Sequence, residues 1–112
     1  MEKDNVVYLK HILDAIIRIE EYTKGFNNKK FNSNNLVQAG VIREIEIIGE
    51  ATKMLSSKFR EKYLFIPWKN IAGMRDKLIH GYFGVDIDAV WKTVEYHIPI
   101  LKKSISKIID NI

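Results

Sequence analysis

The sequence predicts an all-α domain, built as an antiparallel four-helix bundle whose last helix is kinked. Apolar residues recur at helical spacing in four separate stretches, and no stretch alternates long enough to predict a strand. Short polar connections between the stretches favour antiparallel neighbours. A chain of 112 residues with 46% hydrophobic residues fits a single domain spanning residues 1–112 and is too apolar for a disordered segment.

The first predicted helix carries an apolar stripe that turns polar at Glu20. Gly25 is predicted to end this helix, because glycine readily adopts the left-handed conformation that follows many helix C-termini. Residues 27–35 are rich in Asn and Lys and are predicted to form a loop. The stripe comprises Val6, Leu9, Leu13, Ile16 and Ile17.

A second helix is predicted to begin at a cap supplied by Ser33, Asn34 or Asn35. Gly40 and Gly49 lie inside this helix, and each costs about 1 kcal/mol of helix propensity relative to Ala. We therefore expect another helix to approach closely at these glycines. The apolar stripe comprises Leu36, Val41, Ile45, Ile48, Ala51 or Thr52, and Leu55. Three carboxylates expected at the surface or in ion pairs are Glu44, Glu46 and Glu50.

A third helix is predicted to start at Pro67, because proline suits a first helical turn and the residue before it avoids helical geometry. This helix is expected to end near Gly81. A fourth helix is predicted to be capped by Asp86 or Asp88, whose carboxylates favour the positive N-terminus. Pro99 within this helix should kink it or split it in two.

Composition excludes several kinds of site. The chain has no cysteine, which rules out disulfides, thiolate nucleophiles and cysteine zinc sites. Its histidines, at positions 11, 80 and 97, show no metal-ligand spacing, so no metal site is predicted. The net charge of +4 and the pI of about 9.3 are compatible with an anionic partner. No apolar run is long enough for a signal peptide or a membrane span, so we expect a cytoplasmic protein without a membrane partner.

The densest group of chemically useful side chains is Arg75, His80 and Tyr82. Arginine offers a permanent charge and a planar donor fork for phosphate oxygens, and histidine exchanges protons near neutral pH. On a regular helix Arg75 and His80 point about 140° apart. They could converge if the helix distorts or ends at Gly81, or if a second copy faces the first across a twofold axis. The alternative is a surface arginine, a helix-end histidine with a backbone partner and a partly buried tyrosine.

The context of this motif resembles one known family. Residues 66–68 and 71–86, followed by Val90 and Trp91, closely resemble HepT-like HEPN proteins, as do residues 46–51 of the second helix. The resemblance implies a dimeric helical bundle whose Arg-x4-His motif lines a cleft at the interface. It also implies a metal-independent endoribonuclease, commonly the toxin of a toxin–antitoxin pair of the type VII kind. By this resemblance Arg75 and His80 are catalytic, and Asp76 stands where relatives often have Asn or Asp and has a supporting role.

The resemblance further implies a partner enzyme. A minimal nucleotidyltransferase, the cognate antitoxin, would transfer AMP from ATP onto Tyr82, so ATP serves the partner and this chain needs no cofactor. In the implied reaction an RNA 2′-hydroxyl attacks the neighbouring phosphate, His80 acts as general base or acid, and Arg75 stabilises the charge that develops. Two rival hypotheses are a non-catalytic module that binds the nucleotidyltransferase or a nucleotide, and a purely structural helical dimer. Cleavage of RNA that depends on His80 separates the enzyme from both.

Overall fold

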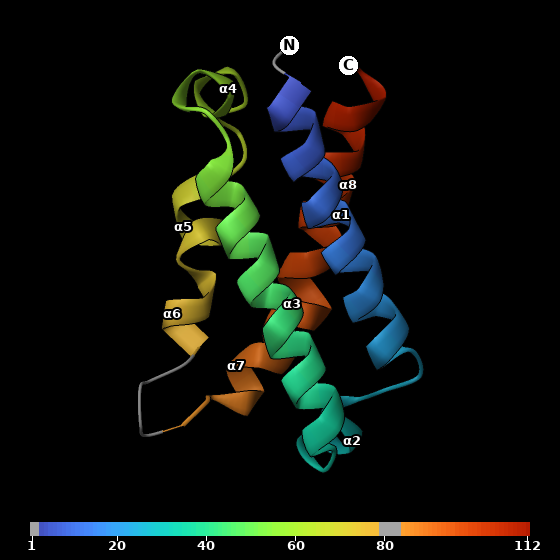
Figure 1. Cartoon of the computed structure of the whole chain (residues 1–112). Coiled ribbons are helices and arrows are strands. Elements are labelled where there is room, and N and C mark those ends of the chain that lie inside the picture. The colour runs from blue at the N-terminus through green and yellow to red at the C-terminus, as the bar shows by residue number, and fades with distance from the viewer. Residues whose placement is uncertain (1–2, 79–83) are drawn as a thin grey trace.

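The computed structural model of the chain describes residues 3–78 and 84–112, and these residues form helices and their connections (Figure 1). The predicted all-α class is therefore confirmed. The longer helices are α1 (Lys3–Thr23), α3 (Asn35–Met54) and α8 (Ile98–Asp110). The shorter elements are α2 (Asn28–Asn32), α4 (Ser57–Lys62), α5 (Trp68–Ala72), α6 (Met74–Leu78), α7 (Ile87–Lys92) and the π-helical segment η2 (Thr93–His97).

In Figure 1, α1 runs downwards and α3 returns upwards, after which α5 and α6 lead down again and α7 and α8 return upwards. α1 contacts both α3 and α8, while α3 also contacts α5 and α6. The two ends of the chain lie at the same end of the molecule (Figure 1). Apolar side chains from these helices meet in one buried cluster, which includes Leu9, Ile12, Ile16, Ile19, Val41, Ile45, Ile48, Val90, Ile98 and Ile105. Burial of this cluster supplies the main driving force for folding.

Helix ends occur where the predicted capping residues lie. Gly25 follows α1 with a φ of 76°, the left-handed conformation expected of it. The Asn34 side chain accepts a hydrogen bond from the Val37 backbone N–H at 3.0 Å and caps α3. At α7 the cap is Asp86, which accepts from the Ala89 N–H at 3.0 Å.

Two predicted boundaries are wrong. Residues 27–35, predicted as a loop, contain the short helix α2. The Asn27 side chain accepts from the Lys30 N–H at 2.8 Å, and the fully buried Phe31 anchors the turn. The predicted third helix is interrupted at Gly73, whose N–H donates to the Lys69 carbonyl at 3.1 Å as α5 ends. The predicted end of this helix near Gly81 lies outside the described residues.

Two residues of the predicted apolar stripes are exposed. Leu36 is 84% exposed, because it lies five positions before Val41 and this spacing turns it about 140° away on the helix. Ile17 is 37% exposed, since it lies about 100° around α1 from the buried Ile16. The predicted fourth helix is divided into α7, η2 and α8, with the π-helical segment η2 ending directly before α8 and Pro99 lying in the first turn of α8.

The three glutamates of α3, which were expected at the surface or in ion pairs, are all ion-paired. Glu44 is buried, and its Oε1 lies 2.7 Å from Arg18 Nε while its Oε2 accepts a hydrogen bond from the Tyr22 hydroxyl at 3.4 Å. The bond from Glu44 raises the pKa of the Arg18 guanidinium above its usual value. This pair joins α3 to α1 and compensates the charge buried on α3.

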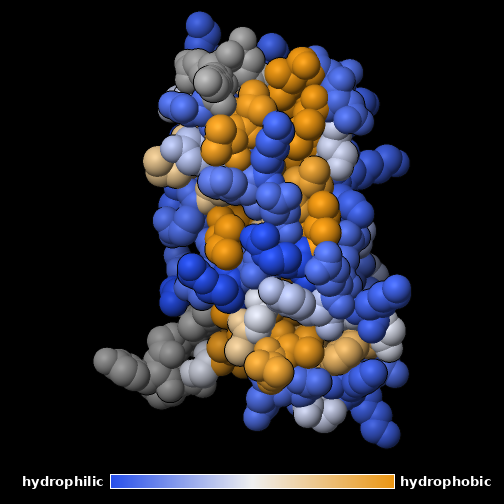
Figure 2. All heavy atoms as spheres, turned by 45° about the vertical axis from the view of Figure 1, so that its right-hand side comes forward, coloured by the Kyte–Doolittle hydropathy of each residue, from blue (hydrophilic) through white to orange (hydrophobic). Residues whose placement is uncertain are grey.

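Figure 2 shows apolar side chains reaching one face of the molecule in patches that hydrophilic side chains separate. Across the described residues, the most exposed large apolar side chains are Leu36, Leu64, Phe65 and Ile100. No helix in the described part of the chain is long and apolar enough to cross a membrane.

Gly49 explains the expected close approach of a helix to α3. A Cβ atom at this buried glycine would lie 3.2 Å from the Ala72 carbonyl oxygen at the end of α5. That neighbour is backbone and cannot rotate away, so a methyl group would push the two helices apart. At Gly40 the neighbours at 3.2 Å are ring atoms of the half-exposed Tyr22, which can shift.

Gly49→Ala should therefore destabilise the protein, whereas Gly40→Ala should not. Each substitution of glycine by alanine improves the helix propensity by about 1 kcal/mol. Overpacking against backbone costs about 1–3 kcal/mol, so Gly49→Ala should lower the free energy of unfolding by about 1 kcal/mol, while Gly40→Ala should raise or preserve it. Urea unfolding of both variants measures the difference. Equal stabilisation by both would contradict the tight contact between α3 and α5.

Candidate active site on helix α6

The position of α6 is set by the short helix before it. Trp68 is buried at the start of α5, and its indole Nε1 donates to the carbonyls of Arg60 at 3.2 Å and Tyr63 at 3.1 Å. Gly73 then ends α5, and its carbonyl accepts a hydrogen bond from the Asp76 N–H at 3.1 Å. At Gly73 the chain thus leaves one helix and begins the next within a single turn.

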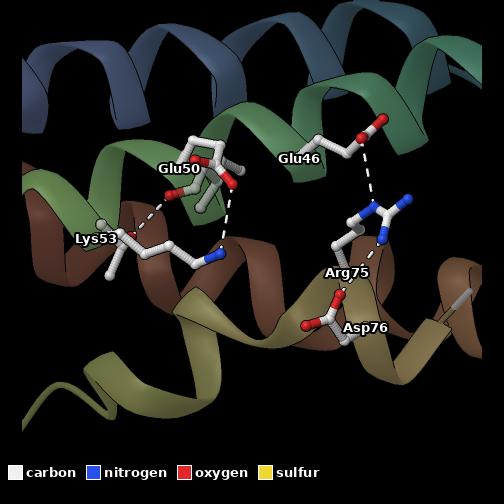
Figure 3. Close-up of polar contacts among 7 residues, drawn as sticks. Glu46, Glu50, Lys53, Arg75 and Asp76 are labelled. Carbon is white, nitrogen blue, oxygen red and sulfur yellow. Dashed lines mark hydrogen bonds and ion pairs between the residues drawn. The ribbon is translucent and has the colours of Figure 1, made fainter.

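α6 presents different side chains on its two sides. Leu78 is buried and Met74 packs against the core cluster. Arg75 lies on the other side, with its Nε 3.3 Å from Glu46 Oε2 on α3 and its Nη1 3.4 Å from Asp76 Oδ1 (Figure 3). The Arg75 side chain is 47% exposed, so its guanidinium is anchored to α3 and still accessible to a ligand.

A cavity of about 260 Å³ lies in front of this arginine, between α3 and the α5–α6 segment. Its charged lining is evenly mixed: Arg43, Lys53 and Arg75 are cationic, and Glu46, Glu50 and Asp76 are anionic. Glu50 pairs with Lys53 at 3.4 Å, one helical turn beyond Glu46 (Figure 3). Gly49 and Ala72 complete the lining. Such a cavity can hold the phosphate of a ligand against Arg75, because guanidinium donors match phosphate oxygens.

The structure places two of the four predicted site residues, Arg75 and Asp76, in direct contact. His80 and Tyr82 lie outside the described residues. Within residues 3–78 and 84–112, no group of three or more His, Asp or Glu side chains is arranged to hold a metal ion.

Sequence reasoning missed the contact between Glu46 and Arg75. It expected an ion pair or a surface position for Glu46 but named no partner. One signal was present: Gly49 lies three residues after Glu46, on the same side of α3, and a glycine inside a helix indicates a closely approaching neighbour. That neighbour is the chain segment that leads into Arg75.

A second, apolar groove of about 410 Å³ lies on the side of α6 that carries Met74 and Leu78. Ile71 of α5 and Leu101 of α8 line it, together with His97 from η2. α6 thus separates a polar cavity from an apolar groove, and Arg75 belongs to the polar side.

Comparison with known proteins identifies relatives along nearly the whole chain. A family model described as ribonuclease HepT-like matches residues 12–108. The chain is 44% identical over 96% of its length to "Probable ribonuclease HepT" of Thermococcus cleftensis, covering 98% of that protein.

Two further relatives come from Methanocaldococcus jannaschii. One, named "Gamma-glutamylcyclotransferase and putative RNase", is 52% identical over the whole chain, which spans half the length of that protein. Another, named "Putative RNase", is 45% identical over 99% of this chain and 92% of its own length. No solved structure matches the chain.

Proposed function

Because the chain belongs to the HepT-like ribonuclease family, we propose that it is an endoribonuclease that cleaves RNA without a metal ion, using Arg75 and His80. The relatives named as ribonucleases cover almost the whole chain and support RNA as the substrate. The observation that carries the proposal is the half-exposed side chain of Arg75, which lines a polar cavity.

In the proposed reaction the 2′-hydroxyl oxygen of one nucleotide attacks the adjacent phosphorus. The bond from phosphorus to the 5′-oxygen of the next nucleotide breaks, which leaves a 2′,3′-cyclic phosphate and a 5′-hydroxyl. His80 takes the proton from the attacking hydroxyl or gives one to the leaving oxygen. Arg75 donates to the phosphate oxygens as negative charge accumulates on them, and a preorganised donor of this kind lowers the barrier directly.

The active form in this proposal is a homodimer, and the protein acts as the toxin of a toxin–antitoxin pair of the type VII kind. A cognate minimal nucleotidyltransferase silences it by moving AMP from ATP onto the Tyr82 hydroxyl oxygen, with pyrophosphate as the leaving group. An anionic adenylate two residues from His80 would occupy the cleft and repel RNA. Asp76, which contacts Arg75, has a supporting role in orienting it.

The test is cleavage of a defined RNA by the purified protein in excess EDTA. We expect products that carry cyclic phosphate and 5′-hydroxyl ends, and no cleavage of an RNA that lacks the 2′-hydroxyl at the cut position. A variant with both Arg75→Ala and His80→Ala, purified identically, controls for contaminating ribonuclease.

The proposal fails if the wild-type protein leaves RNA intact while mass spectrometry shows Tyr82 without AMP. That result would favour the non-catalytic binding module. If EDTA abolishes cleavage and added divalent metal restores it, the proposal of a ribonuclease stands but its metal independence is overturned.

A further inference from the structure

Among the described residues, one contact ties Arg75 to a helix other than its own. Glu46 Oε2 on α3 lies 3.3 Å from Arg75 Nε, while Asp76 Oδ1, the next residue along α6, lies 3.4 Å from Nη1 (Figure 3). No described residue pairs with Nη2. The guanidinium is planar, so a carboxylate that holds Nε also fixes the direction in which Nη2 points.

The two carboxylates that contact Arg75 are not equivalent. Asp76 is 74% exposed and neighbours Arg75 on the same short helix, so it moves whenever α6 moves. Glu46 is 33% exposed and belongs to the 20-residue helix α3, which packs against α1. One turn further along α3, Gly49 lies against the Ala72 carbonyl and fixes the distance between α3 and the segment that carries Arg75.

We propose that Glu46 is a positioning residue that holds the guanidinium of Arg75 in the orientation needed for RNA cleavage. The inference rests on the proposed ribonuclease function. An exposed arginine has several rotatable bonds, and their freedom must be lost each time the side chain engages a phosphate. A carboxylate that holds Nε restricts these bonds before the phosphate binds, so less conformational entropy is lost on binding. Precise placement also matters for the rate, because displacement of a catalytic group by about 1 Å can cost 100-fold.

A merely structural ion pair would behave differently. Partly exposed pairs contribute about 0–1 kcal/mol to stability, so loss of Glu46 should leave the fold almost unchanged. A positioning role requires instead that removing Glu46 lowers kcat. It also requires that this effect disappears when Arg75 has been replaced. Glu20 on α1 provides a matched control, because it is also a partly exposed carboxylate that pairs with a cation on another helix, Lys102 of α8 at 2.9 Å, and it does not line the cavity.

The experiment compares Glu46→Ala, Glu46→Gln and Glu20→Ala, each in the wild-type and the Arg75→Ala backgrounds. Glu46→Ala should lower kcat about tenfold with little change in KM or melting temperature. Glu46→Gln should recover only part of this loss, since it keeps the size of the side chain and an acceptor oxygen but removes the charge of the ion pair. Glu20→Ala should cleave at the wild-type rate, and Glu46→Ala should add nothing in the Arg75→Ala background.

An equal loss in both backgrounds, or wild-type cleavage by Glu46→Ala, would overturn the positioning role while leaving the ribonuclease proposal intact. If the wild-type protein does not cleave RNA at all, the proposed function and the positioning role of Glu46 both fall. A second readout does not need activity: the NMR signal of Arg75 Nε–H should move and exchange faster with solvent in Glu46→Ala and not in Glu20→Ala. An unchanged signal in Glu46→Ala would also overturn the inference.

Discussion

Replacing Arg75 or His80 with Ala is expected to lower the rate of RNA cleavage by at least about 100-fold in each case. Loss of one preorganised donor to a developing charge typically costs about 10²–10³ in kcat. Loss of a general acid or base costs about 10²–10⁴. The two groups act on one transition state, so the double variant should lose less than the product of the single losses.

The fold should survive both replacements if their roles are chemical. The Arg75 side chain is 47% exposed and its ion pairs are partly solvated, which limits their contribution to about 1 kcal/mol. The measurement is kcat/KM together with the melting temperature of each variant. Lys24→Ala, which removes the same charge from an exposed position just after α1, controls for weaker RNA attraction. Cleavage by Arg75→Ala at the rate of Lys24→Ala would exclude a catalytic arginine.

The long helices were predictable from local information. α1 and α3 each carry apolar residues at helical spacing, with Gly25 and Asn34 at the boundaries where the sequence predicts them. The position of Arg75 on a helix was predictable in the same way. These features depend on residues within a few positions of one another, which periodicity and capping rules describe.

The short elements depend on contacts between distant segments. α2 has five residues and little intrinsic preference for helix, yet Phe31 buries its ring against Trp91 and stabilises the turn. The apolar spacing from Ile71 to Leu78 predicts one continuous helix, but the chain is interrupted between them at Gly73. Both apolar residues are nevertheless buried, so the local pattern does not reveal the break. The pairing of Glu46 with Arg75 likewise joins two helices and has no local signature.

Phe31→Ala is expected to destabilise the protein by about 3–5 kcal/mol, the usual cost of removing a fully buried aromatic ring from a core. The Phe31 side chain has no exposed surface, and its ring centroid lies 5.2 Å from that of Trp91. The loss would be a large share of the stability of a domain of this size, which is commonly about 5–15 kcal/mol. Urea unfolding measures it, with the slope checked for two-state behaviour.

Phe65→Ala is the matched control, because this ring is 66% exposed and its removal should change stability by less than about 1 kcal/mol. A similar small effect at Phe31 would mean that α2 is dispensable and that α7 holds its place without it. A large effect would show that α2 braces α7, the helix that follows the segment containing His80 and Tyr82. In that case RNA cleavage by Phe31→Ala should be lost at a lower temperature than in the wild type, in step with unfolding.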